Sequence, residues 1–99
     1  MKQILEFRPA ARAEFDDAAD WYEAQRSGLR AEFTHAVDLT LSTILNTPQT
    51  FPVVYGSNAR RALIRKFPYA IIFSAFADKI IVYSVFHTSR SPMTWRNRL

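Results

Sequence analysis

The pattern of apolar and polar positions begins with a short strand and an amphipathic helix. The mostly apolar run KQILEFR occupies residues 2–8 and stops at Pro9, which is typical of a strand. Proline suits the first turn of a helix, where its missing N–H leaves no hydrogen bond unmade. Apolar residues then recur every three or four positions beside an acidic face, which predicts a helix over residues 9–26. Its apolar stripe consists of Phe15, Ala18, Ala19 and Tyr22.

A second helix follows the first almost directly. The pair Ser27-Gly28 supplies a glycine suited to the left-handed conformation that ends a helix. Apolar residues then repeat at a spacing of four until Asn46-Thr47-Pro48 ends the pattern. These positions are Leu29, Phe33, Val37, Leu41 and Ile44 or Leu45. The short connection predicts two antiparallel helices.

The second half of the chain is rich in β-forming residues. Residues 48–58 contain two prolines and a glycine, so we expect a surface loop there. Three β-rich runs follow at residues 60–67, 69–76 and 79–86, and Ala77-Asp78 has the length of a tight hairpin turn. The last two runs are too continuously apolar for a sheet with one wet face, which predicts central strands under the helices.

The expected fold is one α+β domain over residues 1–99, because a chain this short leaves no room for a second core. It consists of an N-terminal strand, an antiparallel helical hairpin, a three-stranded antiparallel meander and a short C-terminal helical tail. The tail, SPMTWRNRL, is expected to form a helical turn starting at Pro92.

Composition excludes several classes of function. The chain has no cysteine and its two histidines lie far apart, so it lacks a disulfide framework and a metal-ligand cluster. A glycine-rich phosphate loop and a nucleophile elbow are also missing, which argues against the usual hydrolases and kinases. We therefore expect neither a metal nor a cofactor. The charged N-terminus and the lack of a long apolar window predict a cytoplasmic protein with no membrane partner.

Charge is divided unevenly between the two halves. The net charge is +4, yet residues 1–57 carry five Lys/Arg and eight Asp/Glu, whereas residues 58–99 carry eight Lys/Arg and one Asp. A basic half attracts phosphate backbones or an acidic protein segment. Charge by itself does not choose between these partners.

The basic strand at residues 60–66 is the first candidate site. Alternation places Arg61, Leu63 and Arg65 on one face and Ala62, Ile64 and Lys66 on the other. One interpretation is an edge strand whose charges prevent aggregation. The other is a phosphate-binding strand, because the arginine fork grips phosphate with two hydrogen bonds.

The end of the last strand is the second candidate. His87 is able to exchange a proton near neutral pH, and Arg90 to stabilise negative charge, although a lone histidine is more often structural. Trp95 is expected to cover the core, with base stacking as the alternative. His35 has acidic neighbours on its helix and is interpreted as part of a solvated face.

The order of these elements resembles the RelE/ParE superfamily of bacterial type II toxins. The resemblance covers essentially the whole chain and rests on FRPAARAEFDDAADWYEAQ, RRALIRKFPYAIIF and VFHTSRSPMTW. It implies a compact toxin that a cognate antitoxin neutralises by wrapping an extended segment around it. Operator DNA would be contacted only through that antitoxin.

The superfamily resemblance implies two alternative targets. RelE-like members cut mRNA on the ribosome without a metal, and for that branch Arg65 would stabilise the phosphate with help from Arg61. His87 would transfer the proton and Arg90 would bind the phosphate beside it. The chain departs from this branch because its second helix lacks lysines, residues 48–58 lack a carboxylate, and no tyrosine follows Tyr83.

These departures favour the ParE-like branch, whose members poison DNA gyrase without catalysing a reaction. The expected binding residues are Arg60, Arg61, Lys66, Trp95 and Arg96. A small nucleic-acid-binding module is the rival outside the superfamily, because the C-terminal half is basic and rich in Phe and Tyr. An inactive toxin fold kept as a scaffold is a further alternative.

Overall fold

A computed structural model describes residues 3–99 of the chain. It confirms the predicted α+β order, and Lys2 of the first predicted strand lies outside the described residues. The elements are β1 (Ile4–Phe7), α1 (Pro9–Gln25), α2 (Leu29–Asn46), the 3-10 helix η1 (Pro48–Thr50), β2 (Val53–Tyr55), β3 (Ala59–Leu63), β4 (Tyr69–Ala75), β5 (Lys79–His87) and α3 (Met93–Arg96).

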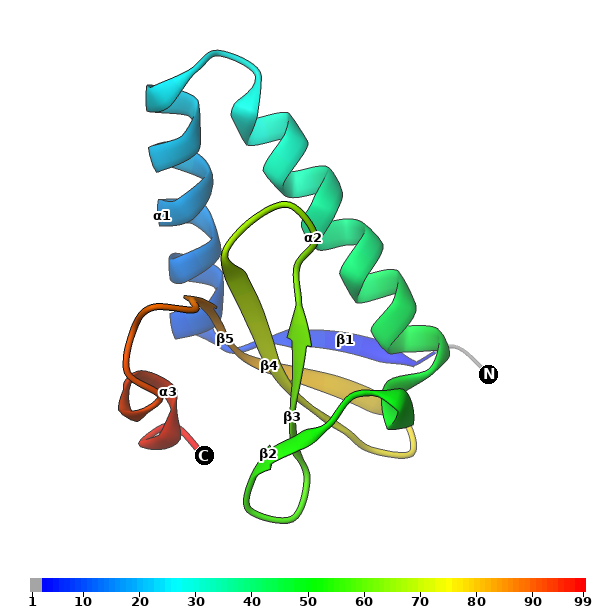
Figure 1. The fold of residues 1–99 in the computed structure, drawn as a ribbon. Helices are drawn as coiled ribbons and strands as arrows, with labels where there is room; N and C mark the ends of the chain where they lie inside the picture. The colour runs from blue at the N-terminus through cyan, green and yellow to red at the C-terminus, as the bar shows by residue number, and fades with distance from the viewer. Residues whose placement is uncertain (1–2) are drawn as a thin grey trace.

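The strands form one sheet in the order β1-β5-β4-β3-β2. β3, β4 and β5 make the predicted antiparallel meander, with β4 at the centre. β1 pairs with β5 in a parallel direction, because α1 and α2 carry the chain across the sheet before the meander begins (Figure 1). The first strand therefore lies beside the last one.

The two helices pack against each other and against the sheet, as their apolar stripes predict. Pro9 is the first residue of α1, and Gly28 has a φ of 96°, the left-handed conformation expected between the helices. Within residues 3–99, no helix is both long and apolar enough to cross a membrane. The largest fully buried side chains of α2 are Phe33, Ile44 and Val37.

Both faces of the central strands are buried, which explains their continuous apolar sequence. Ile71, Phe73 and Val82 pack under the helices in one cluster. On the opposite face, Ile72 and Phe86 pack against Trp95, which is 2% exposed. The prediction that Trp95 covers the core is confirmed. It closes the sheet face that the helices leave open.

The predicted loop over residues 48–58 contains regular structure, so this prediction was wrong. It holds η1 and β2, and Val53 pairs with Arg60 of β3. A three-residue strand bounded by proline and glycine is too short to show a period in the sequence. Arg60 fastens this segment, since its guanidinium donates to the Phe51 carbonyl oxygen at 2.6 Å. β2, rather than β3, is consequently the edge strand.

The basic strand is shorter than predicted. β3 ends at Leu63, and Arg65 and Lys66 lie in the turn before β4. Pro68 has no N–H to donate, so the ladder cannot continue through it. Ala62 and Ile64 are buried as the alternation predicts, but Lys66 is exposed in a left-handed conformation with φ 71°.

The Glu14 carboxylate binds the free edge of β5. β1 pairs only as far as Val82, and the register of β4 and β5 shifts just beyond it. Glu14 Oε1 accepts hydrogen bonds from the Ser84 hydroxyl at 2.9 Å and the Val85 N–H at 3.1 Å. Arg98 donates to both carboxylate oxygens and to the Tyr83 carbonyl oxygen. These side chains form the hydrogen bonds to β5 that a neighbouring strand would otherwise form, and they link the C-terminal tail to α1.

We expect Trp95→Ala to lower the free energy of unfolding by about 3 kcal/mol or more, because it opens a cavity on the second sheet face. Within residues 3–99 the indole N–H has no hydrogen-bond partner, so the loss comes from packing. Urea unfolding followed by circular dichroism measures it. Met93→Ala, at a side chain 55% exposed, is the control and should change little. Equal effects of the two substitutions would contradict a core role for Trp95.

Glu14→Ala should cost about 2 kcal/mol, because it leaves Arg98 and the Val85 N–H without their acceptor. Asp16→Ala is the matched control, because its ion pair with Arg12 is exposed and such pairs contribute about 1 kcal/mol or less. Urea unfolding of both variants gives the comparison. A Glu14 variant as stable as the Asp16 variant would rule out the carboxylate as a structural centre.

Candidate functional site

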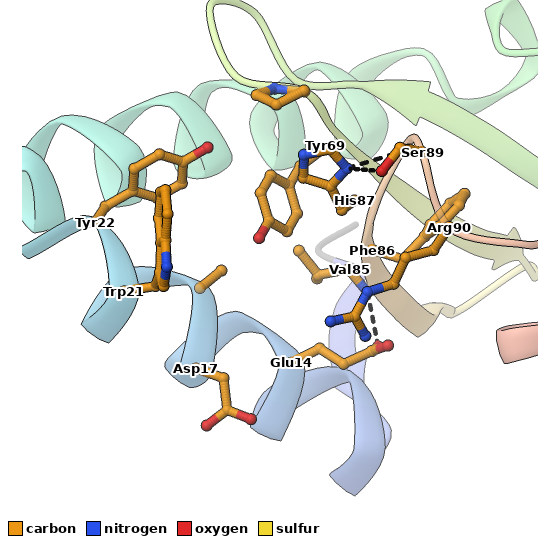
Figure 2. Close-up of a pocket in the computed structure, with 12 residues that line it drawn as sticks. Glu14, Asp17, Trp21, Tyr22, Tyr69, Val85, Phe86, His87, Ser89 and Arg90 are labelled. Carbon is orange, nitrogen blue, oxygen red and sulfur yellow. Dashed lines mark hydrogen bonds between the residues drawn. The ribbon is translucent and has the colours of Figure 1, made fainter. Parts of the chain in front are cut away.

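A cavity of about 640 Å³ lies between α1 and the adjoining ends of β4 and β5. Figure 2 shows side chains from α1 on one wall and from the strands on the other. His87 and Arg90, two of the predicted site residues, both line it. We call this cavity the His87 pocket. The other side chains used below are Glu14, Asp17, Trp21 and Tyr69.

His87 is the last residue of β5 and lies opposite Tyr69 of β4. The two rings meet edge to face, with centroids 5.2 Å apart. The Ser89 backbone N–H donates to His87 Nδ1 at 3.1 Å, and the Ser89 hydroxyl lies 2.7 Å from the same atom. A backbone N–H only donates, so Nδ1 is an acceptor and the neutral ring carries its proton on Nε2.

Two tyrosines of this region stay protonated near neutral pH. Burial raises the pKa of Tyr69, with Arg90 acting in the opposite direction and Glu14 adding to the rise. Burial also raises the pKa of Tyr22, and the nearby Tyr69 adds to it. Both phenols are therefore available as hydrogen-bond donors rather than as bases.

The remaining walls of the pocket combine an exposed aromatic ring with charges of both signs. Trp21 is 57% exposed, and Figure 2 shows it beside the space that the Arg90 guanidinium enters from the other side. Sequence reasoning missed Trp21 and Tyr69 as pocket residues. The sequence could have indicated Trp21, because it lies outside the apolar stripe of α1, where a large aromatic side chain is exposed. Tyr69 carried none, since an aromatic residue in an apolar strand usually packs inside.

Arg65 lines a second cavity, of about 940 Å³, and not the His87 pocket. It lies between α2 and the β3–β4 turn, where both Arg65 and Lys66 line it. His35, exposed on α2 as predicted, lines it too. We call this cavity the α2 groove. Arg65 thus shares a cavity with Lys66, whereas His87 and Arg90 share the other one.

The other predicted binding residues lie on the sheet face opposite the helices or at its edge. Arg61 is exposed on β3, and the Arg96 guanidinium stacks over the Tyr55 ring at 4.9 Å from its centroid. Arg60 holds the Phe51 carbonyl and Trp95 is buried, so both side chains are engaged within the fold. A role for any of the four in binding a target stays a prediction.

The acidic side chains near the pocket do not form a metal site. Within the described part of the chain, no three His, Cys, Asp or Glu side chains gather where they would hold an ion. The Glu14 carboxylate is occupied by Arg98, Ser84 and the Val85 N–H. What the pocket offers a ligand is hydrogen-bond donors, one guanidinium and an aromatic wall.

The helical hairpin covers one face of a five-stranded sheet (Figure 1), which is the small α+β fold that the RelE/ParE resemblance implies. A family model described as "ParE toxin of type II toxin-antitoxin system, parDE" matches residues 5–92. The chain therefore belongs to the ParE toxin family. Membership implies a cognate antitoxin as its partner.

A solved structure supports the fold independently. The chromosomal ParDE toxin-antitoxin system from P. aeruginosa matches with a TM-score of 0.75 over 87% of this chain and 96% of that chain. The two sequences are 11% identical, so this likeness concerns the fold alone. No curated protein sequence matches the chain. The predicted relationship to the RelE/ParE superfamily, with the ParE-like branch favoured, is confirmed.

The raised pKa of Tyr69 makes stability depend on alkaline pH. Folding favours the neutral phenol, so this contribution is complete below the ordinary tyrosine pKa of 10.0 and is lost as pH rises through the higher folded-state pKa. Tyr69→Phe should therefore lose less stability than the wild type between neutral pH and pH above 10. Urea unfolding at a series of pH values measures the difference. Identical losses in the two proteins would contradict the burial of the phenol.

Proposed function

We propose that this protein is a toxin that inhibits DNA gyrase and is neutralised by its cognate antitoxin. Family membership supports the toxin part, and gyrase inhibition is the usual role of ParE toxins. The geometry argues against the alternative, a RelE-like endoribonuclease. The separation of Arg65 from His87 and Arg90 is the observation that carries the proposal.

Cleavage of RNA requires its catalytic groups to converge on one phosphate. A general acid or base acts within about 3 Å of the proton it moves, and charge stabilisation needs a cation at the same oxygen atoms. Arg65 lines the α2 groove, whereas His87 lies in the other cavity. The residues that the resemblance would assign to one active site thus belong to two surfaces.

Most groups of the His87 pocket that could act as a base are engaged within the fold. Glu14 is held by Arg98 and by the Val85 N–H, and Asp17 is an exposed side chain on α1. His87 Nδ1 is occupied by Ser89. Both tyrosines are protonated near neutral pH, and burial raises their pKa further. The arrangement supports binding of a partner better than chemistry on a phosphodiester.

Arg61 and Arg96 are the predicted residues best placed to contact the target on the sheet face opposite the helices. Arg61 is exposed on β3, and Arg96 is fixed over Tyr55. Fixed cations of this kind change association with an oppositely charged surface.

The test is a supercoiling assay with purified gyrase and relaxed plasmid. We expect the protein to stop supercoiling, to accumulate cleaved DNA, and to lose both effects when antitoxin is added. Arg61→Glu should weaken inhibition about tenfold through loss of a cationic contact. Arg12→Glu, an equal charge change on α1, is the control, and circular dichroism verifies folding.

A ribosome assay tests the RNA-cleaving alternative directly. Translating ribosomes mixed with the protein should leave mRNA intact, and His87→Gln should still arrest growth when expressed without antitoxin. Cut transcripts together with loss of growth arrest in His87→Gln would replace gyrase inhibition by RNA cleavage. Unaffected gyrase would equally reject the proposal.

A further inference from the structure

The His87 pocket has hydrogen-bond donors on three side chains that the fold itself does not use. The Tyr69 hydroxyl, His87 Nε2 and the Arg90 guanidinium all belong to residues that line it. Among residues 3–99, none of these three groups takes part in a hydrogen bond or an ion pair. Three such donors at one cavity indicate a ligand that accepts hydrogen bonds.

The turn after β5 holds Arg90 beside the other two donors. The Arg90 N–H donates to the His87 carbonyl oxygen at 3.0 Å, which folds the chain back on itself. Thr88 ties the same turn to the Pro68 carbonyl oxygen through its N–H at 2.8 Å and its hydroxyl at 3.2 Å. Burial raises the pKa of Tyr69 and the Arg90 guanidinium opposes that rise, which requires the guanidinium to lie near the phenol. The three donors therefore converge on one region of the pocket.

The opposite wall of the pocket is an exposed aromatic ring. Trp21 projects from α1, and its ring meets that of Tyr22 edge to face with centroids 5.2 Å apart. Figure 2 shows Trp21 and the Arg90 guanidinium on opposite sides of one space. Ala18 and Val85, both buried, line the same pocket with apolar groups. A flat ring fits against Trp21, because aromatic rings favour offset-stacked and edge-to-face contacts.

The charged side chains of the pocket favour a ligand with a single negative charge. Arg90 is the one Lys or Arg of the described residues that lines the pocket, and Glu14 and Asp17 line it as well. Arg98 neutralises Glu14, whereas Asp17 forms no ion pair among residues 3–99. The guanidinium fork matches both oxygens of a carboxylate. A phosphate with two charges would meet the same single cation while it approaches Asp17, which makes it the poorer fit.

We propose that the His87 pocket binds a small aromatic carboxylate. The carboxylate accepts hydrogen bonds from the Arg90 guanidinium, His87 Nε2 and the Tyr69 hydroxyl, and the aromatic ring of the ligand lies against Trp21. The site is separate from the sheet face assigned to the gyrase contact, so this inference goes beyond the proposed function and does not depend on it. A nucleic acid fits less well, because a run of phosphates would meet one cation in this pocket.

The experiment measures binding of indoleacetate to the full-length protein by calorimetry. We expect saturable binding with a Kd of about 1 mM or below, the range for a ligand of about a dozen heavy atoms. In amide NMR spectra, the Trp21 indole N–H and the backbone N–H groups of His87 and Arg90 should shift. Tryptophol keeps the ring without the charge, and acetate keeps the charge without the ring. Each should bind about tenfold more weakly than indoleacetate or worse.

Variants of the pocket test each contact separately. Arg90→Gln and Trp21→Ala should each raise the Kd for indoleacetate about tenfold, the first by removing the cation and the second by removing the ring. Tyr69→Phe keeps its ring and removes one donor, so it should raise the Kd about threefold or more. Arg65→Gln and Leu39→Ala, both exposed at the α2 groove, are the matched controls and should stay within about twofold of the wild type. Circular dichroism verifies the fold of every variant.

Three results would overturn the proposal. In the first, indoleacetate shows no saturable binding at millimolar concentration. In the second, Arg65→Gln loses binding while Arg90→Gln keeps it, which places the ligand in the α2 groove. In the third, adenosine monophosphate binds more tightly than indoleacetate, which makes the ligand a phosphate instead of a carboxylate. Because no gyrase is present, a failure of gyrase inhibition leaves this measurement intact, and the two proposals are judged separately.

Discussion

The central strands β4 and β5 bury apolar side chains on both faces, and the rest of the structure supplies the two covers that this requires. One cover is the helical hairpin, which packs on Phe73 and Val82. The other is the C-terminal tail, whose Trp95 packs on Ile72 and Phe86. A sheet with one wet face would need neither the tail nor a tryptophan within it. The tail is therefore part of the core, although it follows the last strand.

The C-terminal tail is held in place because it meets α1 at the edge of β5. β1 is shorter than β5, so the last residues of β5 have no strand beside them on that side. Glu14 and Arg98 bind the Val85 N–H and the Tyr83 carbonyl in place of that strand. An acidic helix face and a basic tail, which look like solvated charge in the sequence, are thereby joined. Glu14, which also lines the His87 pocket, is engaged in this structural task.

The β3–β4 turn divides the candidate surfaces of the molecule. On one side, His87 and Arg90 line a pocket with aromatic walls. On the other, Arg65 and Lys66 border the α2 groove. A catalytic site would need these groups together, whereas a protein that binds several partners gains from keeping them apart. Because the turn keeps these two surfaces apart, a partner that covers one of them need not cover the other.

The sequence by itself determined the two helices and the meander, because their apolar residues recur at regular spacings. It also determined the left-handed Gly28, because glycine is suited to end a helix, and the core role of Trp95, because its large ring is buried more favourably than exposed. The same order of elements also indicated membership of the superfamily. Tertiary structure alone decided that residues 53–55 form a strand, since a run so short has no period. It also placed Arg65 and His87 in different cavities, because β3 ends at Leu63 and the turn that follows it faces α2. A cavity forms where segments far apart in the sequence meet, so the spacing of residues along the chain does not predict which side chains line it.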